Sequence, residues 1–165
     1  MNIEEYKKSL KAPLRDRTLM FLKRNDEVVI GFKKRGFGKD NYLGIGGKVE
    51  QGESKEEAVA REVREEIGVE VQKLEYHGYL DFYFPEVIDE SWNQRVHVFA
   101  SSEWTGEPTE TEEIKPFFFK FDRIPYDKMW DDNKVWLPKV LSGEYVAMEF
   151  LFDKDLKVME YKGIR

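Results

Sequence analysis

The sequence predicts one domain of the α/β (α+β) class, in which a mixed β-sheet is sandwiched between helices. Of its 165 residues, 41% are hydrophobic and 15% aromatic, which is enough to bury one core without disulfides or a structural metal. Strand-like runs alternate with two helical segments, as expected when helices cover both faces of a sheet. We find no repeat, low-complexity tract or linker. The predicted domain therefore spans residues 15–165, after a polar N-terminal arm or short helix at residues 1–14.

Runs of β-branched and aromatic residues predict the strands. They are residues 18–22, 27–32, 70–74, 76–84, 95–101, 114–121, 145–152 and 156–161. Turn-forming residues 23–26 join the first two runs and residues 153–155 join the last two, so each pair predicts a hairpin. A helix is predicted from a cap at residues 131–133 to about residue 141, because Gly143 follows as a stop signal.

Residues 54–67 carry the clearest helix signals. Ser54 and Glu57 form a capping-box pattern, and Gly68 follows the last helical turn, where a left-handed residue ends many helices. A narrow apolar stripe at positions i, i+4 and i+8 predicts the side of the helix that faces the core. The stripe consists of Val59, Val63 and Ile67.

Three acids lie on a different face of this helix. Glu62, Glu65 and Glu66 stand at i, i+3 and i+4, so their carboxylates project together and repel by roughly a few tenths of a kcal/mol per pair. A bound cation is a natural compensation, and carboxylate oxygens suit Mg²⁺ or Mn²⁺. The competing interpretation is a solvated acidic surface that Arg61 and Arg64 neutralise through weak ion pairs.

The loop before the helix favours the metal site. Gly46 and Gly47 allow the backbone to approach a metal or a phosphate closely, and Gly52 allows the chain to turn into the helix. Glu53 lies just before the helix cap, where it either accepts hydrogen bonds from loop amides or pairs with Arg61.

Together these residues match the signature of the Nudix hydrolases, G-x5-E-x7-R-E-U-x-E-E-x-G-U, where U is aliphatic. The matching residues are Gly47, Glu53, Arg61, Glu62, Val63, Glu65, Glu66, Gly68 and Val69. A chance match at a given start has a probability on the order of 10⁻⁹ at average residue usage. Over roughly residues 18–155, the chain further resembles the oxidised purine nucleoside triphosphatases of this family, through KKRGFG, GGKV, VHVF and IPYDKMW.

The resemblance implies the Nudix fold and a hydrolase that uses Mg²⁺, with Mn²⁺ as a substitute. Metal-activated water would cleave the substrate to a nucleoside monophosphate and pyrophosphate. The implied metal ligands are a backbone carbonyl of Gly46 or Gly47 and the carboxylates of Glu62, Glu65, Glu66 and Glu113. The implied catalytic residues are Glu62, Glu66 and Glu113, with Glu62 the first candidate to accept the proton of the water and Glu113 the second. Glu53, Arg61 and Gly68 would have structural roles.

The same resemblance implies a purine pocket. Trp130 would stack near the base, Thr18, Phe37 and Phe82 would form walls, and Lys33 and Lys48 would contact phosphates. For the aromatics, core packing is an equal interpretation, and for the lysines, surface solvation is the competing one.

The chain departs from its relatives at the purine edge. Asp132 matches the first of two consecutive acids that read the purine there, but the second acid is Asn133 here. Leu43 stands in place of a pocket asparagine. Both changes alter hydrogen-bonding capacity, so we expect a weaker preference for oxidised guanine.

Charge and composition limit the partners. With 27 basic and 33 acidic residues, the net charge is −6, which argues against a nucleic acid polymer as partner. There is no apolar signal segment or membrane span, and no cysteine is present for thiolate chemistry. We expect a cytoplasmic protein that binds a small nucleotide, as a monomer or alternatively a dimer.

Several functions remain open at this point. The favoured substrates are 8-oxo-dGTP and 2-hydroxy-dATP. Other Nudix substrates, such as ADP-ribose, dinucleoside polyphosphates or other modified dNTPs, are alternatives. A non-catalytic nucleotide sensor is the alternative from another class, although such domains normally lose box glutamates that this chain keeps. An isomerase of this fold is disfavoured because the chain has no cysteine.

Overall fold

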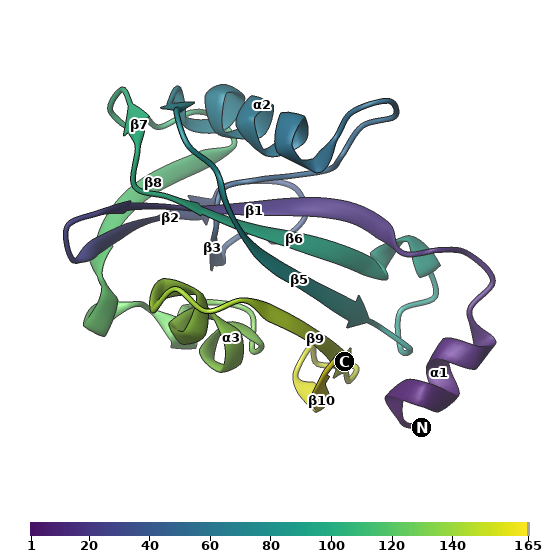
Figure 1. Cartoon of the computed structure of the whole chain (residues 1–165). Coiled ribbons are helices and arrows are strands. Elements are labelled where there is room, and N and C mark those ends of the chain that lie inside the picture. Colours follow the sequence, from purple (N-terminus) through teal and green to yellow (C-terminus); the bar gives the residue numbers. More distant parts are fainter. Residues whose placement is uncertain (165) are drawn as a thin grey trace.

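The computed structural model describes residues 1–164 and contains one mixed sheet between helices (Figure 1). The order of its strands is β10-β9-β5-β6-β1-β2-β3, and β8 pairs with β2 along the whole length of that strand. The strands are β1 (Arg15–Arg24), β2 (Glu27–Lys33), β3 (Tyr42–Leu43), β5 (Glu75–Tyr83), β6 (Gln94–Ser101), β8 (Ile114–Lys120), β9 (Val146–Phe152) and β10 (Val158–Gly163). The β1–β6 and β5–β9 pairs are parallel and the others antiparallel. The predicted mixed sheet is thus confirmed.

Strand β1 connects the two halves of the sheet. Its residues up to Leu22 pair with β6, whereas Lys23 and Arg24 pair with β2 across a two-residue turn. Asn25 has a φ of +59° in this turn, a left-handed conformation that asparagine tolerates. The predicted first hairpin is therefore present, with a shorter turn than residues 23–26.

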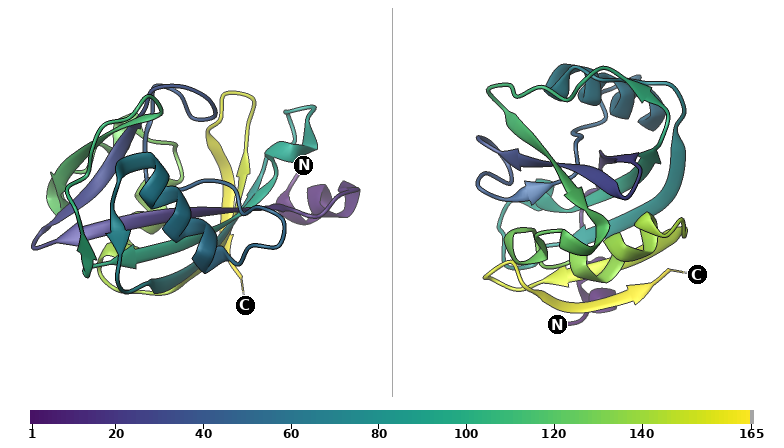
Figure 2. Two further views of the ribbon diagram at one scale, coloured as in Figure 1. Left: turned by 90° about the horizontal axis from the view of Figure 1, so that it is seen from above. Right: turned by 90° about the vertical axis from the view of Figure 1, so that its left-hand side faces the viewer.

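Helix α2 (Lys55–Ile67) covers one face of the sheet and helix α3 (Asn133–Leu141) covers the other (Figures 1 and 2). The capping box of α2 is formed, and its C-cap Gly68 has a φ of +71°. The predicted stripe of α2 is fully buried against β1, β2 and β6, where each such side chain contributes about 1.5–3 kcal/mol. On the other face, Trp136 and Leu137 of α3 enter the larger core.

Several elements differ from the sequence prediction. The strand expected at residues 70–74 is only β4 (Glu70–Val71), which pairs with β7 (Trp104–Thr105) in a separate ladder. Strands β3 and β7 were not predicted. The cap of α3 also differs, because the carboxylate of Asp132 makes no capping hydrogen bond. It instead accepts a hydrogen bond from Trp136 Nε1 at 2.6 Å, since the helix turns that carboxylate toward the core.

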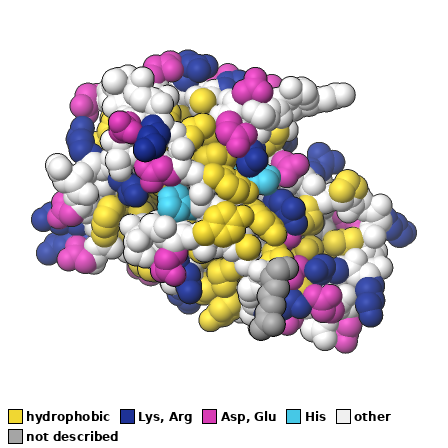
Figure 3. All heavy atoms as spheres, in the orientation of Figure 1, with side chains coloured by type: hydrophobic (Ala, Val, Ile, Leu, Met, Phe, Trp, Pro, Cys, Tyr) yellow, Lys and Arg dark blue, Asp and Glu magenta, His cyan; other side chains and the backbone are white. Residues whose placement is uncertain are grey.

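The N-terminal segment forms helix α1 (Ile3–Ser9), which packs on the sheet. Ile3 and Tyr6 are buried against Tyr83 and Leu151, and Tyr6 accepts a hydrogen bond from Asn93 Nδ2. Acidic and basic side chains are interspersed on the face in Figure 3, with hydrophobic side chains gathered near its middle. Within residues 1–164, no helix has the length and apolar character that crossing a membrane requires.

Candidate active site

The glycine loop lies directly against helix α2. A Cβ atom on Gly47 would come within 2.6 Å of the carboxyl carbon of Glu62, so any larger residue here would displace the Glu62 carboxylate from its present position. The carbonyl of Gly47 accepts hydrogen bonds from the backbone and the hydroxyl of Thr18, at 2.8 and 3.2 Å. The carbonyl of Gly46 makes no such bond in the described part of the chain. Of the two predicted backbone ligands, Gly46 is therefore the one with a free acceptor.

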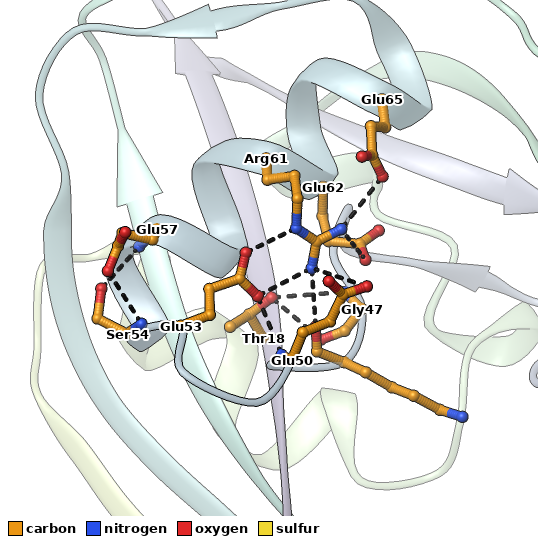
Figure 4. A network of polar contacts seen from close by, with 10 residues as sticks. Thr18, Gly47, Glu50, Glu53, Ser54, Glu57, Arg61, Glu62 and Glu65 are labelled. Atoms are coloured by element: carbon orange, nitrogen blue, oxygen red, sulfur yellow. Dashed lines mark hydrogen bonds and ion pairs between the residues drawn. The ribbon is translucent and has the colours of Figure 1, made fainter.

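Arg61 is the centre of a polar network that joins loop to helix (Figure 4). Its guanidinium makes two bonds with the carboxylate of Glu53, at 2.7 and 3.0 Å, and donates to the Lys48 carbonyl at 3.1 Å. The expected pairing with Glu53 is thus present, and Arg61 lowers the pKa of that carboxyl to about 2. A planar, two-pronged contact of this kind fixes geometry.

Arg61 also contacts two of the three helix acids. Its Nη1 lies 3.1 Å from both Glu62 and Glu65, yet these glutamates differ in exposure. The side chain of Glu65 is 59% exposed and that of Glu62 is 16% exposed, because only one side of α2 faces the loop. Glu65 therefore lies at the rim of the cluster.

Glu66 is the most buried acid of the cluster, with its side chain 10% exposed. Burial raises its pKa to about 7; the charges of Glu62 and Glu113 act in the same direction, and Lys33 opposes them. Lys33 Nζ lies 3.9 Å from Glu66 and 3.3 Å from Glu113. Arg35 binds Glu113 at 2.7 Å, which lowers the pKa of Glu113. The structure thus brings the glutamate from outside the helix to the same cluster.

The carboxylates of these acids are suitable ligands for a divalent cation, although they are not arranged around a common point. Carboxylates, with a free loop carbonyl beside them, form the hard-oxygen donor set that Mg²⁺ requires. In the described residues, no three metal-binding side chains are already arranged around one point, since Arg61 and Lys33 hold the carboxylates in ion pairs. The assignment of Glu62, Glu65, Glu66 and Glu113 as ligands stays a prediction.

A pocket adjoins this cluster, and its lining comes from the strands β1, β2, β5 and β6, the glycine loop and the start of α3. Apart from Lys48, every substrate-binding residue predicted from the sequence lines it. These residues are Thr18, Lys33, Phe37, Leu43, Phe82, Trp130, Asp132 and Asn133. Gly46, Gly47 and Glu66 line its other end, so one cavity joins the acidic cluster to an aromatic interior. Lys48 lines a neighbouring groove instead.

The inner end of the pocket contains an incompletely satisfied carboxylate. Asp132 is buried, and although its Oδ2 accepts from Trp136, its Oδ1 has no hydrogen-bond partner. Burial raises the pKa of Asp132 to about 6. Neighbouring Asn133 donates from Nδ2 to the Trp130 carbonyl at 3.0 Å, which fixes the orientation of its amide. Asp132 is therefore a polar group with capacity for a ligand.

Sequence reasoning missed three residues of this region. Gln94 is buried and lines the pocket, with its Nε2 donating to the Trp92 carbonyl at 2.9 Å. The ring of Trp92 packs edge-on against Phe37 at 4.8 Å. Arg17 lines both the pocket and the adjacent groove. Strand alternation gives the direction of Arg17 and Gln94 only once the register of β1 and β6 is known.

The sequence profile of the NUDIX domain matches residues 13–140. The chain belongs to the Nudix family. It is 36% identical over 147 residues to the oxidized purine nucleoside triphosphate hydrolase of Mus musculus, covering 87% of this chain and 90% of that protein. The protein of the same name from Danio rerio is 37% identical, covering 88% and 91%.

Other Nudix relatives align over less of their length or at lower identity. An NAD-capped RNA hydrolase of Pseudomonas aeruginosa is 36% identical over 65% of this chain, which corresponds to 36% of that protein. The crystal structure of a MutT protein from Bacillus halodurans superposes with a TM-score of 0.76 at 24% identity, covering 90% of this chain and 97% of that chain. This last likeness establishes the shared Nudix fold.

Proposed function

We propose that this protein hydrolyses oxidised purine nucleoside triphosphates, such as 8-oxo-dGTP or 2-hydroxy-dATP, to the monophosphate and pyrophosphate. The observation that carries the proposal is the single cavity that joins the Glu66 cluster to an aromatic pocket ending at Asp132. Relatives in mouse and zebrafish that align over about nine-tenths of their length are named for this activity.

The proposed cofactor is Mg²⁺, with Mn²⁺ as a substitute, held by Glu62, Glu66, Glu113 and the Gly46 carbonyl, with Glu65 at the rim. When bound, such a cation neutralises phosphate charge and acidifies a water molecule. The part of the protein is to hold these carboxylates at fixed positions, which the Arg61 network does for Glu62.

A carboxylate must accept the proton of the attacking water. Glu62 remains the first candidate because it is half-buried, lies against the glycine loop and is oriented by Arg61. Glu113 is the second, but it is 40% exposed and already bound by Arg35 and Lys33. Lys33 stands between the acids and the pocket, a position suited to a phosphate oxygen of the substrate.

The aromatic pocket would hold the purine between Trp130, Phe37 and Phe82, because stacking on aromatic rings tolerates any purine. The free Oδ1 of Asp132 would read the purine edge, as an acceptor when ionised and as a donor when protonated. The amide of Asn133 is fixed by Trp130, and Leu43 offers no hydrogen bond. These features support a purine specificity with a weaker preference for oxidised guanine.

The decisive experiment is a panel of 8-oxo-dGTP, 2-hydroxy-dATP, dGTP, dATP, dCTP, ADP-ribose and a dinucleoside polyphosphate, assayed with Mg²⁺ in ¹⁸O-water. The proposal expects the highest kcat/KM for an oxidised purine triphosphate, with label in the monophosphate. Label in pyrophosphate, or release of orthophosphate, would show a different cleavage site. Equal rates for purines and pyrimidines, or binding without turnover, would reject the proposed substrate class or the hydrolase assignment.

A further inference from the structure

Arg17 is a cation with an unusual environment in this structure. It lies on β1, immediately before Thr18, and its guanidinium stands over the ring of Phe37 at 5.3 Å from the ring centre. The residue is half-buried, yet among residues 1–164 its side chain has no ion pair and no hydrogen bond. The cation–π contact satisfies the face of the guanidinium but none of its five N–H donors.

The position of Arg17 connects the two parts of the site. It lines the purine pocket together with Trp130 and Asp132, and it also lines the adjacent groove. Burial lowers the pKa of Arg17, and the charges of Glu62 and Glu66 oppose this effect. Neither carboxylate is within ion-pair distance. Arg17 and Glu66 both line the pocket, so part of that cavity lies between the guanidinium and the acidic cluster.

The adjacent groove adds two more cations without ion pairs in the described chain. Arg15, one pleat along β1, and Lys48, bridged to Arg17 through the backbone, both line it. The groove is also lined by three acids, each with a partner outside it: Glu53 and Glu50 lie 2.7 and 3.9 Å from Arg61, and Asp16 lies 2.9 Å from His97. In a protein of net charge −6, three such cations along one groove are suited to a polyanion.

We propose that Arg17 binds the phosphate chain of the substrate where it leaves the purine pocket, and that the groove with Arg15 and Lys48 receives its distal end. The inference rests on the proposed function, because it takes the ligand to be a nucleotide in that pocket. An arginine fork can bind two phosphate oxygens at once, so phosphate would lie between Arg17 and the acid-bound cation. Arg17 is a substrate-positioning residue in this arrangement.

The test compares two ligands that differ only in the phosphate chain. Affinity is measured in Mg²⁺ for 8-oxo-2′-deoxyguanosine and for its non-hydrolysable α,β-imido triphosphate, on wild type, Arg17→Gln and Arg17→Lys. Arg123→Gln is the matched control, since Arg123 is exposed at the end of the short helix Phe121–Arg123 and lines neither cavity. Thermal unfolding of each variant checks the fold.

Arg17→Gln is expected to weaken binding of the triphosphate analogue at least ~10-fold, the scale of one lost charge-assisted contact. Binding of the nucleoside should weaken less than ~2-fold. Arg17→Lys should recover part of the loss, because lysine keeps the charge but not the fork. Equal losses for both ligands would mean that Arg17 only supports the wall at Phe37, and no loss for either would also overturn the proposal.

Failure of the proposed function gives a different pattern. If the nucleotide panel selects another base, the same comparison is made with that nucleoside and its triphosphate analogue. The ratio of the two affinities depends on the phosphate chain and not on the base. A wrong base assignment therefore leaves the Arg17 effect intact, whereas a wrong Arg17 assignment leaves the panel result intact.

Discussion

Replacing Asp132 by asparagine should change how the stability of the protein depends on pH. The folded protein holds this carboxyl with a pKa of about 6, raised by burial from an ordinary 3.8. A group whose pKa is higher in the folded state stabilises the fold at low pH. That contribution is fully present below the unfolded pKa and is lost as the pH rises through the folded pKa. The sensitive window thus lies between about pH 4 and pH 7.

The magnitude follows from the two pKa values. The difference between 3.8 and about 6 corresponds to about 3 kcal/mol, of which roughly 2–3 kcal/mol falls between pH 4 and pH 8. The asparagine keeps an oxygen for Trp136 Nε1 but adds a buried amide donor, at a cost of about 1–3 kcal/mol. That cost does not depend on pH. The titration of Asp132 is therefore reported by how the difference in free energy of unfolding between the two proteins changes with pH. The size of that difference at any single pH does not report it.

The assay is urea unfolding followed by far-ultraviolet circular dichroism at several pH values in EDTA, on wild type and Asp132→Asn. The free energy of unfolding of wild type minus that of the variant should fall by roughly 2–3 kcal/mol from pH 4 to pH 8. Asp131→Asn is a matched control, because the backbone of Val158 lowers the pKa of Asp131 and its contribution is lost as the pH falls. A difference that stays flat for Asp132→Asn would refute the reasoning.

Three further predictions concern catalysis and binding. Glu66→Gln should lower kcat at least ~10²-fold while the thermal midpoint is retained, since this acid faces the cluster and not the apolar stripe; unchanged kcat would remove Glu66 from the catalytic set. Trp130→Ala should raise KM for every purine triphosphate about 10-fold, as loss of base stacking does, and a change confined to one purine would contradict this. Gly47→Ala would place its Cβ 2.6 Å from the carboxyl carbon of Glu62, so kcat should fall in a folded protein. In Gly46→Ala the new Cβ meets the backbone of β1, so the thermal midpoint should fall instead; equal midpoints in the two variants would count against the close approach.

The helix that carries the acids was predictable because its signals are local. The capping box, the terminal glycine and the apolar stripe all depend on residues within a few turns, and each is formed as expected. By contrast, β3 and β7 have two residues each and exist because a partner strand lies beside them. No periodicity develops over two residues, so such strands cannot be recognised from sequence alone.

The spacing of residues along a helix also predicts the direction in which a side chain points, but not how far that side chain is buried. Glu65 and Glu66 were expected to project from one face, yet their side chains are 59% and 10% exposed. The difference arises because the glycine loop and β2 cover only one flank of α2. The cap expected at residues 131–133 does lie at Asp132, but its carboxylate makes no capping hydrogen bond, since tertiary packing places Trp136 where it donates to that carboxylate.

Pocket residues such as Gln94 and Arg17 could not be assigned from sequence without knowing the strand pairing. Arg17 stands opposite Val96 in the parallel pair of β1 and β6, and it bridges to Lys48 in the glycine loop. A shift of one residue in this register would turn Arg17 away from Phe37 and toward the opposite face. Its relation to the pocket is therefore a property of the assembled sheet.

The ion pairs around the cluster show why a cation must accompany the substrate. The carboxylates of the cluster outnumber the cations that contact them. The acids are Glu53, Glu62, Glu65, Glu66 and Glu113, and the cations are Arg61, Lys33 and Arg35. Burial raises the pKa of Glu66 to about 7, so with Glu66 ionised five negative charges face three positive ones, and this surplus opposes an approaching triphosphate. Arg17 lies on the far side of the space and can attract only part of the phosphate chain. A divalent cation would balance a surplus of two, so under the proposed function the acids that oppose the bare substrate would also hold the ion that admits it.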